Sequence, residues 1–327
     1  MASMITMFLQ SAYSMIDGLF VSNLIGDTAL SAVNVAWPVI AVVTAIGTGV
    51  GCGGAVMMST KQGEGKNEES NIVRANVILA LLASSIVVTI LFLILLTPLL
   101  KLMGAEGELL RLSQIYGRVM LTGGVLQILS CGLTPLLRND NRAVSAMMIM
   151  VGGLFANLGL DFVFMYVFHM GIGGAAGASL CAQLFTTVCC LMILCTKKTD
   201  PIRLSQFMIR KEYWKKIFKT AVSPFGISLT HSLLILYHNV ACLKFGGDLA
   251  VNAYALISST VGSYRVLLIG VAEGIQPLAS YAYGAHDFHA IRKIRNKAVI
   301  TAIGVSFFLF IFTIATARFY PTIYGYE

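Results

Sequence analysis

The chain has 327 residues, of which 57% are hydrophobic and only 12% are charged. A soluble domain carries about 25% charged residues, and the mean hydropathy of +0.81 also indicates a membrane protein. At roughly 20 apolar residues per crossing, the chain has room for many spans. These numbers exclude a secreted disulfide scaffold, a nucleic-acid-binding domain and an ordinary cytosolic enzyme. They predict an all-α polytopic membrane protein whose seven cysteines pack inside apolar stretches.

Nine candidate spans follow one another along the chain, separated by polar residues or by glycine and proline. They lie near residues 3–25, 29–59, 72–100, 110–137, 142–168, 174–196, 213–245, 249–283 and 290–320. Residues 197–219 form the most basic stretch, which predicts a linker leading into an amphipathic helix on the membrane surface. We therefore expect an N-lobe of six helices over 1–196, a basic cytoplasmic linker over 197–212 and a C-lobe of three helices over 213–327.

The positions of Lys and Arg predict the orientation of these spans. The loops after the even-numbered spans hold 17 of the 23 basic residues, and the loops after the odd-numbered spans hold 5. Cytoplasmic loops are enriched in Lys and Arg, so the N-terminus and the even-numbered loops are expected in the cytoplasm. The net charge of +8 then reflects membrane orientation, and no nucleic-acid partner is expected.

An internal repeat appears when the chain is shifted against itself by 221 residues. Residues 26–63 then align without gaps on 247–284, with nine identities that include Gly49 on Gly270 and Gly63 on Gly284. Six spans separate the copies, so both copies have the same orientation. Parallel repeats of this kind are one known plan of transporters. In this register the second copy stops after three of six helices, which predicts a truncated chain.

Ionisable residues inside spans are costly and are functional candidates by default. Gln10 and Asp17 are seven residues apart in the first span, and Asn157 and Asp161 are four apart in the fifth, so each pair shares a helix face. Burial disfavours the charged form of a carboxylate. Two such groups are suited to exchanging a proton for a cation or a drug. The alternative is a capped or snorkelling Asp near a helix end.

The repeat places Gln10 on His231 and Asp17 on His238. Because histidine titrates near neutral pH, this face is a candidate for proton sensing or substrate contact. A pair of hydrogen-bonded core histidines is the favoured interpretation, with the proton-sensitive or substrate-contacting face as the alternative. Glu273 and Arg265 in the eighth span stand on a candidate cavity wall, and an ion pair between them that holds the lobe together would explain them equally well.

Several catalytic motifs are either absent from the sequence or lack the surrounding structure that they require. Gly49-x-Gly51-x-x-Gly54 fits a dinucleotide fingerprint, but no βαβ unit surrounds it, and close helix packing explains the glycines. The segment before Asp161 lacks the GxGD motif of intramembrane aspartyl proteases. No serine-nucleophile elbow, zinc spacing or phosphate-binding loop is found, so the chain is not expected to be an enzyme or to need a cofactor.

Four segments resemble the multidrug and toxic compound extrusion (MATE) family, of the bacterial NorM/MepA type. They are Tyr13–Val21 with its Asp17, Pro135-Leu-Leu-Arg138-Asn139-Asp140, Asn157-x-x-x-Asp161, and Gly274-Ile-Gln276-Pro277 through Ala285. The resemblance implies twelve helices in two six-helix lobes that export organic cations against Na⁺ or H⁺. It implies a cation-coupling site at Gln10, Asp17, Asn157, Asp161 and, by position, Ser179.

From this resemblance we expect Na⁺ as a candidate ligand of Asp17, Asn157 and Asp161. A substrate or proton face in the C-lobe is expected at His231, His238, Glu273 and Gln276. The family commonly has Gln where this chain has Glu273.

The leading functional hypothesis is therefore a cation-coupled multidrug antiporter, monomeric when complete, in the bacterial inner membrane. Its partners would be cationic or amphipathic drugs and the lipid bilayer, and its coupling ion Na⁺ or H⁺. One alternative is a lipid-linked oligosaccharide flippase of the same superfamily, which predicts a cationic cavity for phosphates. Another is an inactive truncated membrane protein or a scaffold paired with another chain.

Overall fold

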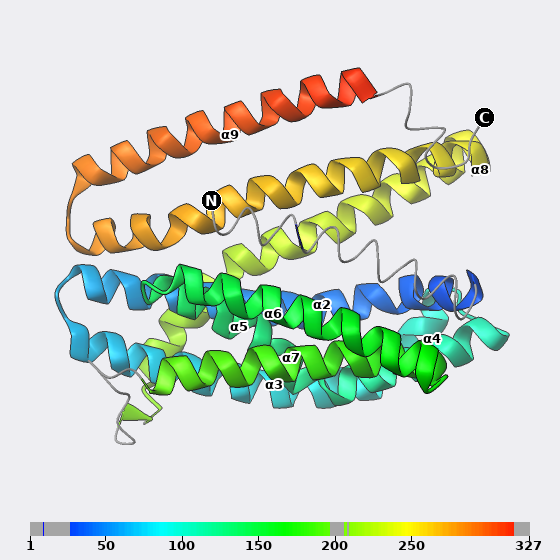
Figure 1. The fold of residues 1–327 in the computed structure, drawn as a ribbon, viewed down its shortest axis with the longest axis horizontal. Coiled ribbons are helices and arrows are strands. Elements are labelled where there is room, and N and C mark those ends of the chain that lie inside the picture. The colour runs from blue at the N-terminus through cyan, green and yellow to red at the C-terminus, as the bar shows by residue number, and fades with distance from the viewer. Residues whose placement is uncertain (1–8, 10–26, 197–205, 208, 317–327) are drawn as a thin grey trace.

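The computed structural model describes residues 9, 27–196, 206, 207 and 209–316, and these residues contain helices and turns but no β-strand. Figure 1 shows a bundle of long helices, with α9 and the last part of α8 forming a layer on one side of it. The all-α fold is confirmed. The elements are α2 (Asp27–Gly63), α3 (Asn67–Leu102), α4 (Gly107–Thr122), α5 (Gly124–Asn139), α6 (Ala143–Asp161), the π-helix η1 (Phe162–Val167), α7 (Gly171–Cys195), α8 (Lys211–Gly284) and α9 (Phe288–Thr316).

Length and apolar composition decide which of these helices can cross a membrane. Five described stretches meet both conditions, and a sixth is added if α4 and α5 count as one bent span. The five are in α2, α3, α6 with η1, α7 and α9. All seven cysteines are free thiols, as expected for a protein whose cysteines lie in apolar helices.

Helix α2 lies at the centre of the bundle because its glycines allow close approach. A Cβ added to Gly51 would lie 2.3 Å from the carbonyl oxygen of Gly132 on α5. Gly49 faces α8 in the same way, and Gly54 faces the side chain of Val77 on α3. The glycines of the apparent dinucleotide fingerprint therefore pack three helices around α2, which confirms their structural interpretation.

The predicted span over 110–137 is wrong as a single helix. It is divided into α4 and α5, which are bent by 58° at Gly123. A Cβ on Gly123 would lie 2.1 Å from Cδ2 of Leu180 on α7, so the bend brings the chain against α7 at a position without a side chain.

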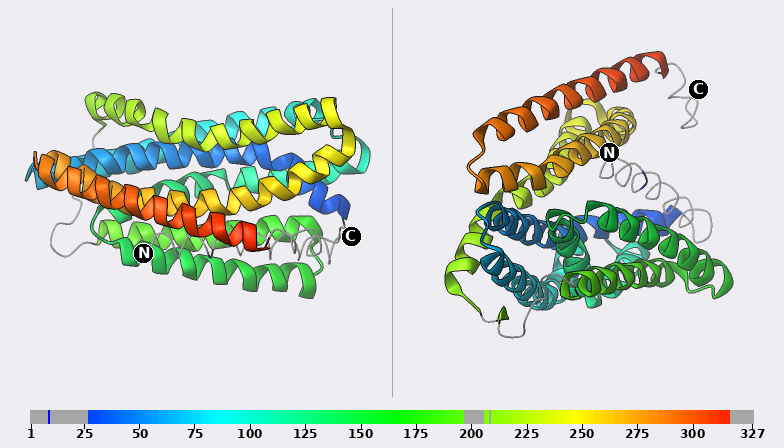
Figure 2. Two further views of the ribbon diagram at one scale, coloured as in Figure 1. Left: turned by 90° about the horizontal axis from the view of Figure 1, so that it is seen from above. Right: turned by 60° about the vertical axis from the view of Figure 1, so that its left-hand side comes forward.

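The two spans predicted over 213–245 and 249–283 lie in one continuous helical element, α8, whose two parts fold back on each other. Arg265 Nη2 donates to the carbonyl oxygen of Ile227 at 3.3 Å, and the rings of His238 and Tyr254 stack with centroids 5.1 Å apart. A straight helix rises about 1.5 Å per residue. Residues 38 and 16 apart in sequence would then be too far apart to touch, so α8 cannot be straight. Both pairs centre near residue 246, where the ribbon reverses (Figure 2), between the two predicted spans.

The internal repeat is visible as a symmetric contact between α2 and α8. A Cβ on Gly63 would lie 2.0 Å from the carbonyl oxygen of Tyr281, and a Cβ on Gly284 would lie 2.0 Å from that of Thr60. The 221-residue shift converts Thr60 into Tyr281 and Gly63 into Gly284, so it exchanges the two contacts. We call α2–α7 the N-lobe and α8–α9 the C-lobe, and this pseudo-two-fold contact joins them.

Candidate functional site

A cavity of about 640 Å³ opens within the N-lobe and reaches the C-lobe at Glu273. Its volume lies in the range of about 300–1,000 Å³ that is typical of sites for drug-sized molecules. Apolar and aromatic side chains such as Trp37, Met120 and Met150 form part of the wall. The uncharged polar lining is made of amide and hydroxyl side chains: Asn34, Thr44, Thr48, Tyr116, Gln127, Ser130, Thr134, Asn157, Ser179, Gln183 and Thr186.

Two glutamines in this wall have unused hydrogen-bonding capacity. Gln127 on α5 is 1% exposed, and neither its amide oxygen nor its amide nitrogen has a partner among the described residues. The side-chain oxygen of Gln183 on α7 is also without one there. A buried polar group without a partner costs about 1–3 kcal/mol. Because both glutamines line the cavity, a molecule bound in it can supply the missing partners.

Asn157 connects the cavity to a buried carboxylate. Its Nδ2 donates to Oδ2 of Asp161 at 3.0 Å, which confirms that the two residues share a helix face. Asn157 lines the cavity, whereas Asp161 is fully buried behind it at the end of α6. The helix continues from there as the π-helix η1, a form found often at functional sites.

The remaining predicted N-lobe residues divide into two groups. Ser179 on α7 lines the same cavity as Asn157, so the structure brings these two together. Gln10 and Asp17 fall outside the described residues, and their place in a cation site stays a prediction.

At the C-lobe end of the cavity, Arg138 of α5 forms an ion pair with Glu273 of α8. Both side chains are largely buried, with 8% and 18% exposed. Of the two interpretations of Glu273, its place on the cavity wall is confirmed and its pairing with Arg265 is wrong. Eight residues along a helix correspond to about 12 Å of rise, whereas α5 presents Arg138 directly across the interface between the lobes. Glu273 therefore ties the C-lobe to the N-lobe.

The histidine face is described only in part. His231 lies in α8, but its side chain is outside the described part. His238 is half-buried, with Nδ1 2.8 Å from the carbonyl oxygen of Leu234 and its ring stacked on Tyr254. Among the described residues, neither His238 nor Gln276 belongs to the cavity lining. A substrate or proton role for this face stays a prediction.

A buried polar cluster supports the end of the cavity at Arg138. Arg74 of α3 and Asp140 each have 1% of the side chain exposed, and Arg74 Nη1 lies 3.3 Å from Asp140 Oδ2. Gln62 Nε2 donates to the other carboxylate oxygen at 3.1 Å, and Ser59 Oγ donates to the side chain of Asn139 at 3.1 Å. The cluster fixes the segment after Arg138 to α2 and α3.

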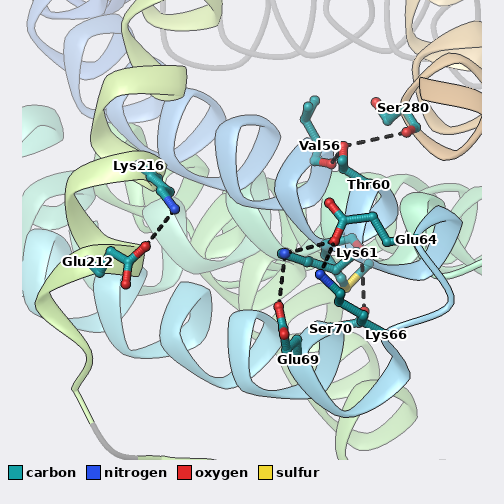
Figure 3. A network of polar contacts seen from close by, with 11 residues as sticks. Val56, Thr60, Lys61, Glu64, Lys66, Glu69, Ser70, Glu212, Lys216 and Ser280 are labelled. Atoms are coloured by element: carbon teal, nitrogen blue, oxygen red, sulfur yellow. Dashed lines mark hydrogen bonds and ion pairs between the residues drawn. The ribbon is translucent and has the colours of Figure 1, made fainter. Parts of the chain in front are cut away.

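The ends of α2 and α8 meet at Thr60 and Ser280, as Figure 3 shows. Thr60 Oγ1 donates to the carbonyl oxygen of Ser280 at 3.4 Å. Lys61 Nζ lies 2.9 Å from both Glu64 and Glu69, and Lys66 lies 3.0 Å from Glu64. These hydrogen bonds, first from Lys61 and then from Lys66, hold the pKa of the Glu64 carboxyl below its usual value.

Sequence reasoning missed Gln127, Gln183 and the role of Arg138. The signal for the two glutamines is their position inside apolar spans, the same feature that marks Gln10. Arg138 stood in a segment used for the family resemblance, but its partner is 135 residues away and no local pattern indicates it.

A multi-pass helical fold with an internal repeat and a polar cavity extending between its lobes is the plan of a secondary transporter. The family model described as MatE matches residues 2–163 and 226–327, and the chain belongs to this family.

Relatives and solved structures agree with this assignment. The multidrug export protein MepA of Staphylococcus aureus (strain N315) is 26% identical over 310 residues, covering 93% of this chain and 67% of MepA. MepA of Staphylococcus saprophyticus is 24% identical over 302 residues, covering 92% and 66%.

Two solved structures cover the whole of this chain and 72% of their own, each at 26% identity. A MOP superfamily transporter from Pyrococcus furiosus, for which a reversed polarity of the binding pocket suggests a different function, superposes with a TM-score of 0.94. A multidrug resistance MATE family transporter of the same superfamily, in an outward-facing conformation, superposes with a TM-score of 0.93.

Proposed function

We propose that this chain exports cationic or amphipathic drugs in exchange for Na⁺ or H⁺ by alternating access. The observation that carries the proposal is the hydrogen bond from Asn157, in the cavity wall, to the buried carboxylate of Asp161. It connects a compartment of drug size to a group that an inorganic cation or a proton can neutralise. No catalysis and no cofactor are part of the proposal.

In this mechanism Asp161, together with Asp17, takes the coupling ion. Burial disfavours a bare carboxylate, so a cation or proton is favoured there when drug is absent. Asn157 changes its hydrogen bonding when Asp161 is neutralised, and this alters the cavity wall that the drug touches. Each charge moved through a potential of 100 mV supplies roughly 2.3 kcal/mol, enough for one or two ions to drive export.

The contacts between the lobes support an outward-facing state. The lobes touch at Gly63 and Gly284, at the end that the charge bias assigns to the cytoplasm, and Arg138 pairs with Glu273 close to that end. Opening toward the cytoplasm would require these contacts to separate. Export would then alternate between this state and one in which Glu273 is free to meet a cationic drug.

The test is efflux of a cationic dye from cells that express the chain. We expect Asp161→Asn to reduce efflux to the level of cells without the chain. Asp287→Asn, at an exposed turn, is the matched control and should leave efflux unchanged. Inverted vesicles with an imposed Na⁺ or pH gradient identify the coupling ion. Unchanged efflux in Asp161→Asn would remove Asp161 from the mechanism.

The cavity also discriminates against the flippase alternative. Phosphate cargo needs free cationic groups, whereas the basic residue in the described lining, Arg138, is already paired with Glu273. The alternative of an inactive chain predicts neither dye binding by the purified protein nor dye efflux from cells.

The proposal includes a location in the bacterial inner membrane, with the N-terminus in the cytoplasm and a monomeric transporter. The bias of Lys and Arg supports the orientation. Reporter fusions at the loop over residues 64–66 and near residue 246 test it, because they are expected on opposite sides of the membrane.

A further inference from the structure

A second hollow, of about 260 Å³, lies between the two lobes and apart from the central cavity. Apolar residues line it on both sides: Ile46, Gly49 and Val50 of α2, and Phe218, Ala221, Val222 and Phe225 of α8. Gly49 keeps α2 close to α8, because an added Cβ would lie 3.0 Å from Cβ of Phe225. Phe218 and Val222 are 41% and 67% exposed, so this interlobe groove opens to the outside of the protein.

A row of cations continues the groove toward the start of α8. Residues three and four apart share a helix face, so the groove-lining face of α8 continues one turn back to Lys215 and two turns back to Lys211. Both are exposed. Trp214 lies between them in this row and packs edge-to-face against Phe218, with ring centroids 6.1 Å apart.

The charges in this row are available to a ligand. Glu212 pairs with Lys216 at 2.6 Å, as Figure 3 shows, and so does not neutralise the row. Within the residues that the structure describes, no carboxylate pairs with Lys211 or Lys215. Two nearby carboxylates, Glu64 just after α2 and Glu69 in the first turn of α3, are paired with Lys61 and Lys66.

We propose that the interlobe groove binds one anionic phospholipid, with an acyl chain between α2 and α8 and the phosphate against Lys211 and Lys215. An acyl chain suits a narrow apolar hollow that opens sideways, and the hollow is smaller than a typical drug site. An anionic headgroup suits a basic cluster at the cytoplasmic surface, where anionic lipids attract such clusters. The half-buried Trp214 has the amphipathic ring favoured at this depth of a membrane.

The bound lipid would touch both lobes and fill the space between them. It would stabilise the packing of α2 on α8 and so favour the arrangement in which the lobes touch at Gly63 and Gly284. The binding itself does not depend on the proposed transport activity, so either can fail without the other.

The experiment measures lipids retained by the purified chain. The protein is placed in nanodiscs of phosphatidylcholine with a minor fraction of phosphatidylglycerol, and retained lipids are counted by native mass spectrometry. We expect one phosphatidylglycerol to be retained in preference to phosphatidylcholine. Lys211→Gln/Lys215→Gln should lower that preference by roughly 30-fold, and Lys211→Arg/Lys215→Arg should restore it.

Two further variants separate the groove from its charges. Val222→Phe fills the hollow and should abolish lipid retention while both lysines remain. A thermal midpoint equal to that of the wild type is the control that this variant folds. Lys293→Gln/Lys297→Gln, on exposed positions of α9, removes equal charge away from the groove and should have no effect.

Three results would overturn the proposal. The first is wild-type retention in Lys211→Gln/Lys215→Gln, and the second is an equal loss in the α9 control. The third is displacement of the lipid by inorganic phosphate alone, which would indicate a phosphate site that makes no use of the apolar groove.

Discussion

Helices α3 and α9 are equivalent in the internal repeat, yet they lie in different surroundings. In the most apolar stretch of α3, 39% of the residues are buried, against 6% in α9. Arg74 of α3 is fully buried and paired with Asp140. Its counterpart Arg295 on α9 is exposed and donates to the side chain of the neighbouring Asn296. The same position of one repeat is thus a core ion pair in one copy and a surface residue in the other.

The comparison shows that neighbouring helices, and not the helix's own sequence, decide the role of a residue. Asp140 follows α5, and Asn71 and Gln62 complete the surroundings of the Arg74–Asp140 pair. In α9 the described structure places no such helix over Arg295. Substitutions at equivalent positions of the two copies should therefore have unequal effects, and the following predictions use this inequality.

The largest difference is expected at Arg74 and Arg295. Arg74→Met leaves the buried carboxylate of Asp140 without its cation and should destabilise the protein by about 3–5 kcal/mol. Arg295→Met should change stability by less than about 0.5 kcal/mol. Thermal unfolding in detergent measures the stability of both variants against the wild type. The double variant Arg74→Met/Asp140→Leu should recover much of the loss, and failure to recover would show that the ion pair is not its source.

A smaller effect is expected where the copies touch. Gly63→Val or Gly284→Val inserts side-chain atoms against the backbone of the other copy and should cost about 1–3 kcal/mol. Gly304→Val on α9 is the control, because nothing lies within 4 Å of its added Cβ. Equal unfolding midpoints for Gly63→Val and Gly304→Val would contradict the tight contact between the lobes.

The turns after α2 and α8 each contain a residue with left-handed backbone geometry, and this residue is glycine in the first turn and histidine in the second. Gly65 has φ +75° and its repeat equivalent His286 has φ +55°. A side chain at positive φ is strained, so Gly65→Ala should destabilise by about 1 kcal/mol and His286→Gly should stabilise by a similar amount. Thermal midpoints measure both. Opposite signs are the expected result, and destabilisation by His286→Gly would show that its side chain makes a stabilising contact.

The smallest effect is a pH dependence confined to the first turn. The pKa of Glu64 is held below its usual value, so its stabilising contribution is present above the unfolded value of about 4.3 and is lost as the pH falls through the lower folded value. The equivalent position in the second turn is Ala285.

The free energies of unfolding of wild type and Glu64→Gln, from thermal unfolding, should differ by less than about 1 kcal/mol at about pH 6. The difference should disappear as the pH falls below the lowered pKa of Glu64. Ala285→Gln in the second turn provides the comparison and should show no such convergence. A constant difference between wild type and Glu64→Gln at all pH values would exclude the ion pairs as its cause.

Local spacing predicted much of this fold. The apolar helices of the described residues, the repeat and the shared face of Asn157 and Asp161 all depend on residues close in sequence or on a fixed shift, and the structure contains them. The bend at Gly123 was not predicted, because it depends on Leu180 of α7 occupying the space beside the glycine.

The sequence did not predict contacts between residues that are far apart along the chain. The ion pair of Glu273 joins helices of different lobes, whereas the arginine that its own span offered as a partner was Arg265. The unpartnered amides of Gln127 and Gln183 become visible only when the cavity they face is known. Pairings between lobes depend on how the lobes dock, and the periodicity of residues within a single helix carries no information about that docking.

The contact of Gly63 and Gly284 bears on the ancestry of the fold. Two identical subunits that meet about a two-fold axis place each residue of one against the swapped residue of the other. The lobes meet in this manner, with position 60 of each copy against position 63 of its counterpart. A gene for a single lobe whose product formed a homodimer would give this geometry after duplication and fusion, and each glycine would then be retained because the backbone of its duplicate leaves no room for a larger residue.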